Sequence, residues 1–232
     1  MSYLKSFSGR SQWIFICLAS LGSMLIACQQ ASVNVSEPPS GPLKIEKILV
    51  LPFKDLSDLP GENPDARSPV SGRIFITGEV AANATDFLTD RLVTWLQSHT
   101  AYEIQIPDYS QRPASILDPA GSDLVLNRKN LVELGQKEAV DAVLLGFVYR
   151  FRERVGKGFS AESPASVAFD LYLIRVRDGR TVWSASFDET QQSLDQNLFQ
   201  LGTFLSRGGR WITAEDMATT GLDRILKKFP KQ

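Results

Sequence analysis

The sequence has few of the side chains that bind metals or act as catalytic nucleophiles. Among 232 residues there are two cysteines, Cys17 and Cys28, and one histidine, His99. Zinc, copper and haem sites draw their ligands largely from histidines and thiolates, so the chain lacks a ligand set for them. His99 lies just after an expected helix at 79–97, where a solvated histidine is usual. We therefore predict no catalytic residue, no metal site and no cofactor.

An excess of positive charge is also absent. Lysine and arginine number 25 and aspartate and glutamate 26, which gives a formal net charge of -1. Proteins that bind nucleic acids usually present a strongly basic surface. The charge balance argues against a nucleic-acid partner.

Only one long apolar run occurs, and it lies near the N-terminus. Lys5 and Arg10 precede an uncharged stretch from Trp13 to Ala27. This stretch is shorter than the roughly 20 apolar residues of a membrane-spanning helix and suits the core of a secretory signal. We predict that residues 1–27 form a signal peptide that is removed. An uncleaved membrane anchor is the alternative.

The run ends at a cysteine in a distinctive setting. Leu25-Ile26-Ala27-Cys28 resembles the lipobox of bacterial lipoproteins, which implies that Cys28 receives a diacylglyceryl group and that its freed amine is then acylated, for example with palmitate. Three acyl chains suffice for stable membrane anchoring. Gln29 is not the aspartate that retains such proteins at the inner membrane. The expected location is therefore the inner leaflet of the outer membrane, facing the periplasm.

The rest of the chain divides into a tether and one domain. Residues 28–43 are polar and contain three prolines, and we expect them to be the lipidated cysteine and a flexible tether. Fully extended, such a tether reaches roughly 50 Å. Residues 44–230 are expected to form a single globular envelope domain. No thiol is left for a disulfide, since Cys17 leaves with the signal peptide and Cys28 carries lipid.

The hydrophobic periodicity of the domain predicts an α+β fold. The element order is β-α-β-α-β-β-β-α, which implies a single mixed sheet of about five strands with helices mainly on one face. We expect strands at 45–53, 102–106, 141–153, 167–176 and 181–188, and helices at 79–97, 128–138 and 213–229. Asn127 and Thr213 are the expected N-caps. Long loops cover 54–78, where 73–77 is a candidate short strand, and 107–126.

The turn between the last two strands can be predicted in more detail. A two-residue loop, Asp178-Gly179, would put the apolar residues of the two strands on opposite faces. A three-residue loop, with Gly179 in the left-handed conformation, pairs Val176 with Arg180 and brings those residues to one side. The second register pairs Leu173 with Trp183, Leu171 with Ala185 and Phe169 with Phe187.

Three segments are similar to a known group of envelope domains. The strand Lys47-Ile48-Leu49-Val50-Leu51-Pro52-Phe53, the helix end Leu131-Val132-Glu133-Leu134-Gly135 with the strand at 140–146, and the hairpin at 177–183 resemble CsgG-type domains. The N-terminal domain of TolB and the lipoprotein activator of penicillin-binding proteins share that architecture. The motifs are structural and imply fold more than function. The loops at 54–78 and 154–166 lack the alternation of membrane strands, so we expect no pore.

Five arginines are candidates for an interaction patch. Arg150, Arg152 and Arg154 alternate along one strand, and Arg207-Gly208-Gly209-Arg210 forms a glycine-flanked turn. Together they suggest a basic surface for an acidic partner, anionic headgroups or peptidoglycan carboxylates. The alternative, which we favour, is a solvated strand end paired with Glu153 and Glu162, and a turn that only precedes a helix.

These observations leave three hypotheses for function. The leading one is a lipid-anchored, non-enzymatic interaction or scaffold module of the cell envelope, held by lipid at Cys28 and bound to an envelope protein of unknown identity. The second is a subunit of an oligomeric secretion or transport apparatus. The third is a small-ligand binder or enzyme built on the 54–78 and 107–126 loops, which would require a pocket with converging polar groups.

Overall fold

The computed structural model describes seven stretches of the chain. They belong to a compact unit that starts at Ala31, and they comprise residues 32–36, 43–57, 65–107, 115–120, 123–155, 163–191 and 212–231. The expected signal peptide and Cys28 lie outside them. Within these stretches, no helix is both long enough and apolar enough to span a bilayer.

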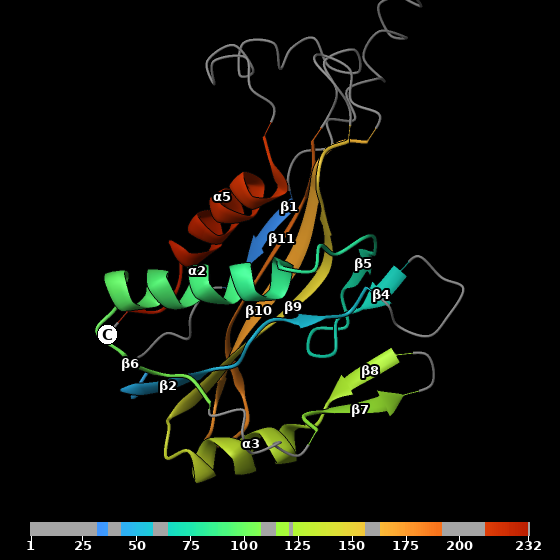
Figure 1. Ribbon diagram of the computed structural model, residues 1–232. Helices are drawn as coiled ribbons and strands as arrows, with labels where there is room; N and C mark the ends of the chain where they lie inside the picture. The colour runs from blue at the N-terminus through green and yellow to red at the C-terminus, as the bar shows by residue number, and fades with distance from the viewer. Residues whose placement is uncertain are drawn as a thin grey trace, which may run out of the picture. The chain divides into compact units, whose positions relative to one another are not determined.

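A mixed seven-stranded sheet forms the centre of the unit (Figure 1). Its order is β1-β11-β10-β9-β2-β6, and β3 also pairs with β9. The pairs β2–β6, β2–β9 and β3–β9 are parallel, whereas β9, β10, β11 and β1 are joined antiparallel. The bounds are Ser32–Val35 (β1), Lys47–Val50 (β2), Lys54–Asp55 (β3), Glu103–Gln105 (β6), Ala142–Arg152 (β9), Ser166–Arg175 (β10) and Thr181–Thr190 (β11).

The described stretches contain three helices that connect or cover these strands, and the predicted caps are confirmed. The Asn127 side chain accepts a hydrogen bond from the Asn130 backbone N–H, 2.9 Å away. Thr213 and Asp216 form a complete capping box. Because side chains satisfy the first backbone N–H groups, both helices begin where the sequence predicts. The helices are Ala84–His99 (α2), Arg128–Lys137 (α3) and Ala214–Leu226 (α5).

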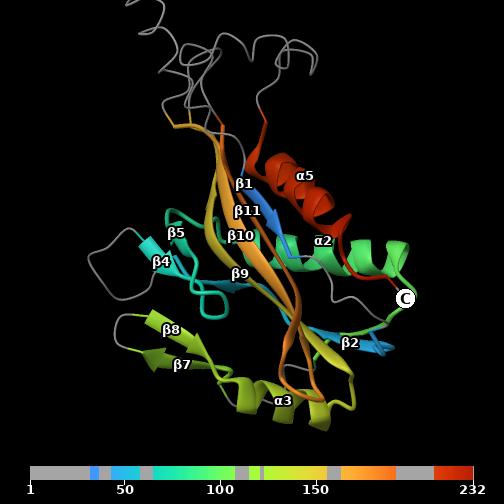
Figure 2. The ribbon, with the colours of Figure 1, turned by 180° about the vertical axis from the view of Figure 1, so that it is seen from behind.

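Each face of the sheet carries its own apolar core. On one face α2 and α5 cover the larger cluster, which includes Trp183 and Phe187. On the other face lie α3 and two hairpins, around Phe75, Leu131 and Phe147 (Figures 1 and 2). The mixed sheet and the α+β class are confirmed, and α3 is the helix on the second face. The hairpins pair Asp65–Arg67 (β4) with Ile74–Ile76 (β5), and Leu117–Ala120 (β7) with Asp123–Leu126 (β8).

The predicted register of the last hairpin of the sheet is confirmed. Leu173 pairs with Trp183, Leu171 with Ala185 and Phe169 with Phe187, and Gly179 has a φ of 64°. The predicted pair of Val176 with Arg180 is wrong: the Arg175 N–H donates to the carbonyl of Arg180 at 2.9 Å, so the loop is one residue longer than predicted. A register shift between Leu173 and Ile174 absorbs the difference. The apolar pairs of β10 and β11 therefore keep the predicted register, and the turn after Arg175 differs from the prediction.

Strand β1 corrects the prediction of a continuous flexible tether at 28–43. Residues Ser32–Val35 pair antiparallel with β11, and Ser36 continues the contact through backbone and side-chain hydrogen bonds to Ser184. Val35 packs against the α2/α5 core, whereas Ser32 and Asn34 alternate to the other face. The short alternation Ser-Val-Asn-Val therefore outweighs the polar, proline-containing composition that suggested a tether.

Candidate functional site

One face of the sheet becomes polar toward its β1 edge. On β10, the residues Ser166, Ala168, Asp170 and Tyr172 alternate onto the face of the two hairpins, where Ala168 and Tyr172 join the core. Their neighbours on β11 and β1 continue the polar pattern. We call the following set the polar face: Ser32, Asn34, Ser166, Asp170, Tyr172, Ser184, Ser186, Asp188 and Thr190.

A buried carboxyl group lies at the inner side of the polar face. Asp170 is fully buried, and its Oδ2 accepts hydrogen bonds from the hydroxyls of Tyr149 at 3.0 Å and Tyr172 at 2.6 Å. The Tyr172 oxygen also lies 2.8 Å from Oγ of Ser68 and 2.7 Å from Oγ of Ser71. These contacts connect β9 and β10 to the segment around hairpin β4–β5.

The electrostatics of this cluster follow from its burial. Burial raises the pKa of Asp170 to about 7, although the hydroxyls of Tyr172, Ser68 and Tyr149 act in the opposite direction. Burial and the nearby Asp170 raise the pKa of both Tyr149 and Tyr172, so both remain protonated donors. None of the described residues donates a hydrogen bond to Oδ1 of Asp170. The carboxyl group therefore carries its charge at a cost in free energy above neutral pH.

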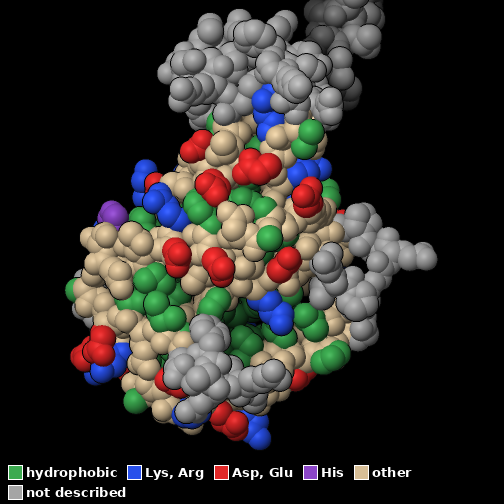
Figure 3. All heavy atoms as spheres, in the orientation of Figure 1, with side chains coloured by type: hydrophobic (Ala, Val, Ile, Leu, Met, Phe, Trp, Pro, Cys, Tyr) green, Lys and Arg blue, Asp and Glu red, His purple; other side chains and the backbone are tan. Residues whose placement is uncertain are grey.

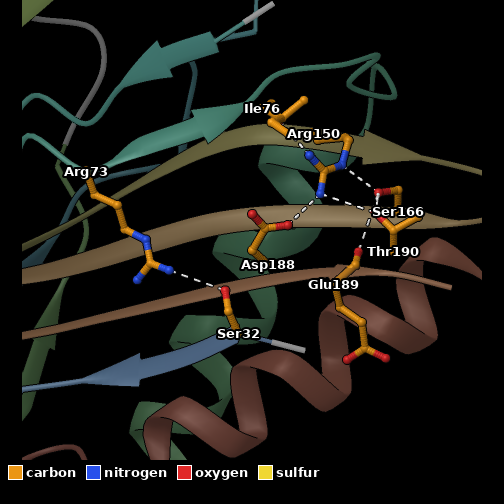
Figure 4. A network of polar contacts seen from close by, with 8 residues as sticks. All are labelled: Ser32, Arg73, Ile76, Arg150, Ser166, Asp188, Glu189 and Thr190. Carbon is orange, nitrogen blue, oxygen red and sulfur yellow. Dashed lines mark hydrogen bonds and ion pairs between the residues drawn. The ribbon is translucent and has the colours of Figure 1, made fainter. Parts of the chain in front are cut away.

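Arg150 forms the second polar network, at the far end of β9 (Figure 4). Its guanidinium donates to Oγ of Ser166, to the carbonyl oxygen of Ile76 and to Oδ1 of Asp188, each at 2.5 Å. Arg150 is only 7% exposed. Arg150 thereby cross-links β9 to β10, β11 and β5 inside the fold.

A β-bulge explains why Arg150 turns inward. Ala168 pairs with Arg150, but the next residue of β10, Phe169, pairs with Val148, so Tyr149 is the extra residue. A bulge of this kind keeps two consecutive side chains on one face. Arg150 thus points toward hairpin β4–β5, where its stem passes Gly78: a Cβ added there would meet the Arg150 Cδ at 3.0 Å.

Arg73 lies at the solvent side of the polar face and contacts the edge strand. It donates to Oγ of Ser186 at 2.8 Å. It also donates to Oγ of Ser32 at 3.3 Å, the contact drawn in Figure 4. With its amide turned so that the oxygen faces Arg73, Asn34 accepts from the same guanidinium at 2.6 and 3.0 Å. The guanidinium also stands 5.4 Å above the ring of Phe75. Arg73 therefore fastens β1 to hairpin β4–β5.

A pocket of about 240 Å³ opens beside Arg73. Hydroxyl, amide and guanidinium groups line it, chiefly those of Asn34, Ser36, Ser71, Arg73, Tyr172 and Ser186. Ser71 and Arg73 come from the 54–78 loop, one of the two loops named for the ligand-binding hypothesis. Most donors of Arg73 are already engaged by β1 and β11, however, so the pocket walls chiefly support the fold.

The arginine patch predicted from the sequence is not assembled as a surface around Arg150. Arg150 is buried in its ion pair, whereas Arg152 at the end of β9 and Arg154 just beyond it are partly exposed. Glu153 accepts a hydrogen bond from the Ala214 N–H at the start of α5, 3.2 Å away. On the face seen in Figure 3, acidic and basic side chains are interspersed. Arg207, Arg210 and Glu162 lie outside the described residues, so their part of the patch stays a prediction.

The remaining predicted position, His99, lies where the sequence suggested. It is exposed at the end of α2, its Nδ1 is 3.0 Å from the carbonyl oxygen of Trp95, and its ring stacks on the Trp95 ring at 4.6 Å. Across the described stretches, no three histidine, cysteine, aspartate or glutamate side chains are placed to hold a metal ion.

Sequence comparisons find no relative: no family model matches the chain, and no curated protein matches it. Solved structures do show a likeness. The PelC dodecamer from Paraburkholderia phytofirmans is 14% identical, with 88% of this chain and 99% of that chain covered and a TM-score of 0.51. The chain shares the PelC fold. At this identity the PelC likeness extends to the fold alone.

Bacterial lipoproteins are also among the structural neighbours. Lipoprotein GNA1162 from Neisseria meningitidis is 17% identical, with 70% of this chain and 94% of that chain covered and a TM-score of 0.39. The C-terminal domain of LpoB from Salmonella enterica is 13% identical, with coverages of 64% and 86% and a TM-score of 0.35. The resemblance to CsgG stays a prediction.

Proposed function

We propose that this chain is a lipid-anchored, non-enzymatic interaction or scaffold module of the cell envelope, attached to the inner leaflet of the outer membrane and facing the periplasm. The observation that carries the proposal is the segment Leu25-Ile26-Ala27-Cys28, which follows an apolar stretch and precedes a folded unit almost directly. The charged groups inside that unit support a non-enzymatic role. Arg150 and Arg73 make their contacts within the fold and hold its strands together.

The edge of the sheet offers a surface for the proposed envelope partner. Strand β1 has β11 on one side, and no described strand pairs with its other side. Backbone N–H and C=O groups on such an edge can pair with an added strand. Val33, which is 38% exposed, adds an apolar contact at this position.

Replacing Cys28 by serine tests the anchor, and Cys17 provides a matched control. Serine lacks the thiol that accepts the diacylglyceryl group, so we expect the Cys28→Ser protein to lose labelled palmitate and to move from the membrane fraction to the soluble envelope fraction. Cys17→Ser should change neither, because the lipobox predicts lipid only at Cys28. A Cys28→Ser protein that stays in the membrane fraction would contradict the proposal.

An oligomeric secretion or transport subunit is the second candidate, because the structural neighbour PelC is described as a dodecamer. The two candidate functions predict different oligomeric states for the acyl-free protein that starts at residue 29. The leading proposal expects a monomer when the molar mass is measured by light scattering at high protein concentration. A closed ring of defined mass would favour the second candidate instead.

A further inference from the structure

The start of strand β1 limits the distance between the folded unit and the membrane. Ser32 is the first residue of β1 and follows Cys28 by four positions. Four fully extended residues span at most about 14 Å. If Cys28 carries lipid, as the proposed function holds, Ser32 must lie within this distance of the lipid surface, and the roughly 50 Å reach of a free tether does not exist.

The register of the strands shows which end of the sheet this is. Ser32 pairs with Asp188, near the end of β11. Ser166, the first residue of β10, pairs with Arg152, the last residue of β9. The start of α5 lies here too, because Glu153 accepts a hydrogen bond from the Ala214 N–H. We call this the proximal end; Figures 1 and 2 show it at the top of the sheet.

The opposite, or distal, end consists of the β10–β11 turn and α3. A guanidinium nitrogen of Arg128 in α3 donates to the carbonyl of Gly179 in that turn at 2.7 Å. Along β11 the chain runs from Asp188 back to Thr181, which corresponds to about 23 Å at 3.3 Å per residue. This length exceeds the reach from Cys28 to Ser32, so the two ends differ clearly in their distance from the anchor.

The side chains of the proximal end suit contact with a lipid surface. Val155 is 53% exposed there and stands next to the partly exposed Arg154, two residues beyond Arg152. Apolar side chains beside arginines, whose stems cover apolar surface while the guanidinium meets headgroups, are typical of a membrane interface. Acidic side chains also lie at this end and have partners within the fold: Asp188 pairs with Arg150, Glu189 pairs with Arg224, and Glu153 accepts from the Ala214 N–H.

A flat orientation is less favourable for the same unit. Laying the sheet on its β1 side would press backbone groups of β1 that pair with no described strand against lipid, where they lose water without gaining a partner. From the short reach, the register and the side chains, we infer that the proximal end of the domain rests against the lipid surface. The sheet then stands away from the membrane, and the β10–β11 turn and α3 lie farthest from the lipid.

Distance-dependent quenching in vesicles tests this orientation. The lipidated mature protein has no free thiol apart from an introduced one, so a fluorophore can be placed at Val155→Cys on the proximal end or at Arg177→Cys in the distal turn. Arg177 is exposed. In phosphatidylethanolamine and phosphatidylglycerol vesicles with headgroup-spin-labelled lipid, we expect several-fold stronger quenching at position 155. Equal quenching at both positions, or stronger quenching at 177, would overturn the inference.

Two further measurements separate this inference from the proposed function. Flotation with the vesicles reports lipidation, so a protein that does not float contradicts the anchor itself, whereas a floating protein without a quenching difference contradicts only the orientation. Inserting about 15 glycine and serine residues between Gln30 and Ala31 adds roughly 20 Å of mean reach. The inserted protein should float and lose the difference. A difference that persists would show that the short link to β1 does not hold this end at the membrane.

Discussion

Replacing Arg150 by methionine should lower the free energy of unfolding by about 3 kcal/mol, the range seen when one partner of a buried ion pair is removed. Methionine fills much of the space of the stem but leaves Asp188 without its cation and the Ile76 carbonyl without a donor. Unfolding in urea, followed by circular dichroism, measures the loss. The free energy of unfolding of Arg150→Lys should lie between those of the parent protein and Arg150→Met, because an ammonium group cannot make the forked hydrogen bonds of a guanidinium.

Arg152 is the matched control, since it stands two residues further along the same strand and is partly exposed. Its replacement by methionine should change stability by less than about 1 kcal/mol. Equal stability of Arg150→Met and Arg152→Met would contradict the proposal that Arg150 cross-links the strands inside the fold. It would favour the surface patch that the sequence suggested.

The two arginines also show where sequence reasoning stops. Alternation along a strand correctly predicted β9 and placed Arg150, Arg152 and Arg154 on one face. The bulge at Tyr149 keeps Arg150 and Arg152 together but moves them to the face of Tyr149 and hairpin β4–β5, and it depends on how β9 pairs with β10 rather than on local sequence. The direction of a side chain after a bulge therefore could not be predicted from one strand alone.

Local signals were sufficient elsewhere. The caps Asn127 and Thr213, the apolar stripe of α5 and the left-handed Gly179 are short-range features, and the structure confirms them. The hairpins β4–β5 and β7–β8 were largely missed because their strands are short; only the strand at Ile74–Ile76 had been a candidate. Strand β1 was missed because four alternating residues were weighed against a polar, proline-containing segment.

One residue of the polar face, Asp170, could have been recognised from the sequence. Asp170 interrupts an apolar strand, Val167-Ala168-Phe169-Asp170-Leu171, and charged residues are rarely buried without a partner. That pattern could have marked it as a buried carboxyl group. The hydrogen bonds around it could not be predicted, because Tyr149 reaches Asp170 only through the pairing of β9 with β10, and Ser68 reaches Tyr172 only through the packing of hairpin β4–β5.

Asp170 also has a specific effect on stability, one that depends on pH. The pKa of its carboxyl group is about 7 in the folded protein against 3.8 without the fold, chiefly because of burial. The folded state therefore holds the proton more tightly than the unfolded chain. The stabilisation that comes from this tighter proton binding by Asp170 is complete below about pH 4, decreases as the pH rises and is lost above 7. A shift of this size corresponds to a loss on the order of 4 kcal/mol.

Asp170→Asn should remove this loss, because a neutral amide resembles the protonated carboxyl group and its oxygen can still accept from Tyr149 and Tyr172. We expect the variant and the parent protein to have similar stability near pH 4. By pH 8 the variant should be more stable by a few kcal/mol.

Asp188→Asn is the opposing control, since it removes the partner of Arg150 and should destabilise the protein at pH 8. Urea unfolding at a series of pH values gives both curves. If Asp170→Asn were the less stable protein at pH 8, the two tyrosine hydroxyls would outweigh burial, and the ionised form of Asp170 would be the one the fold requires.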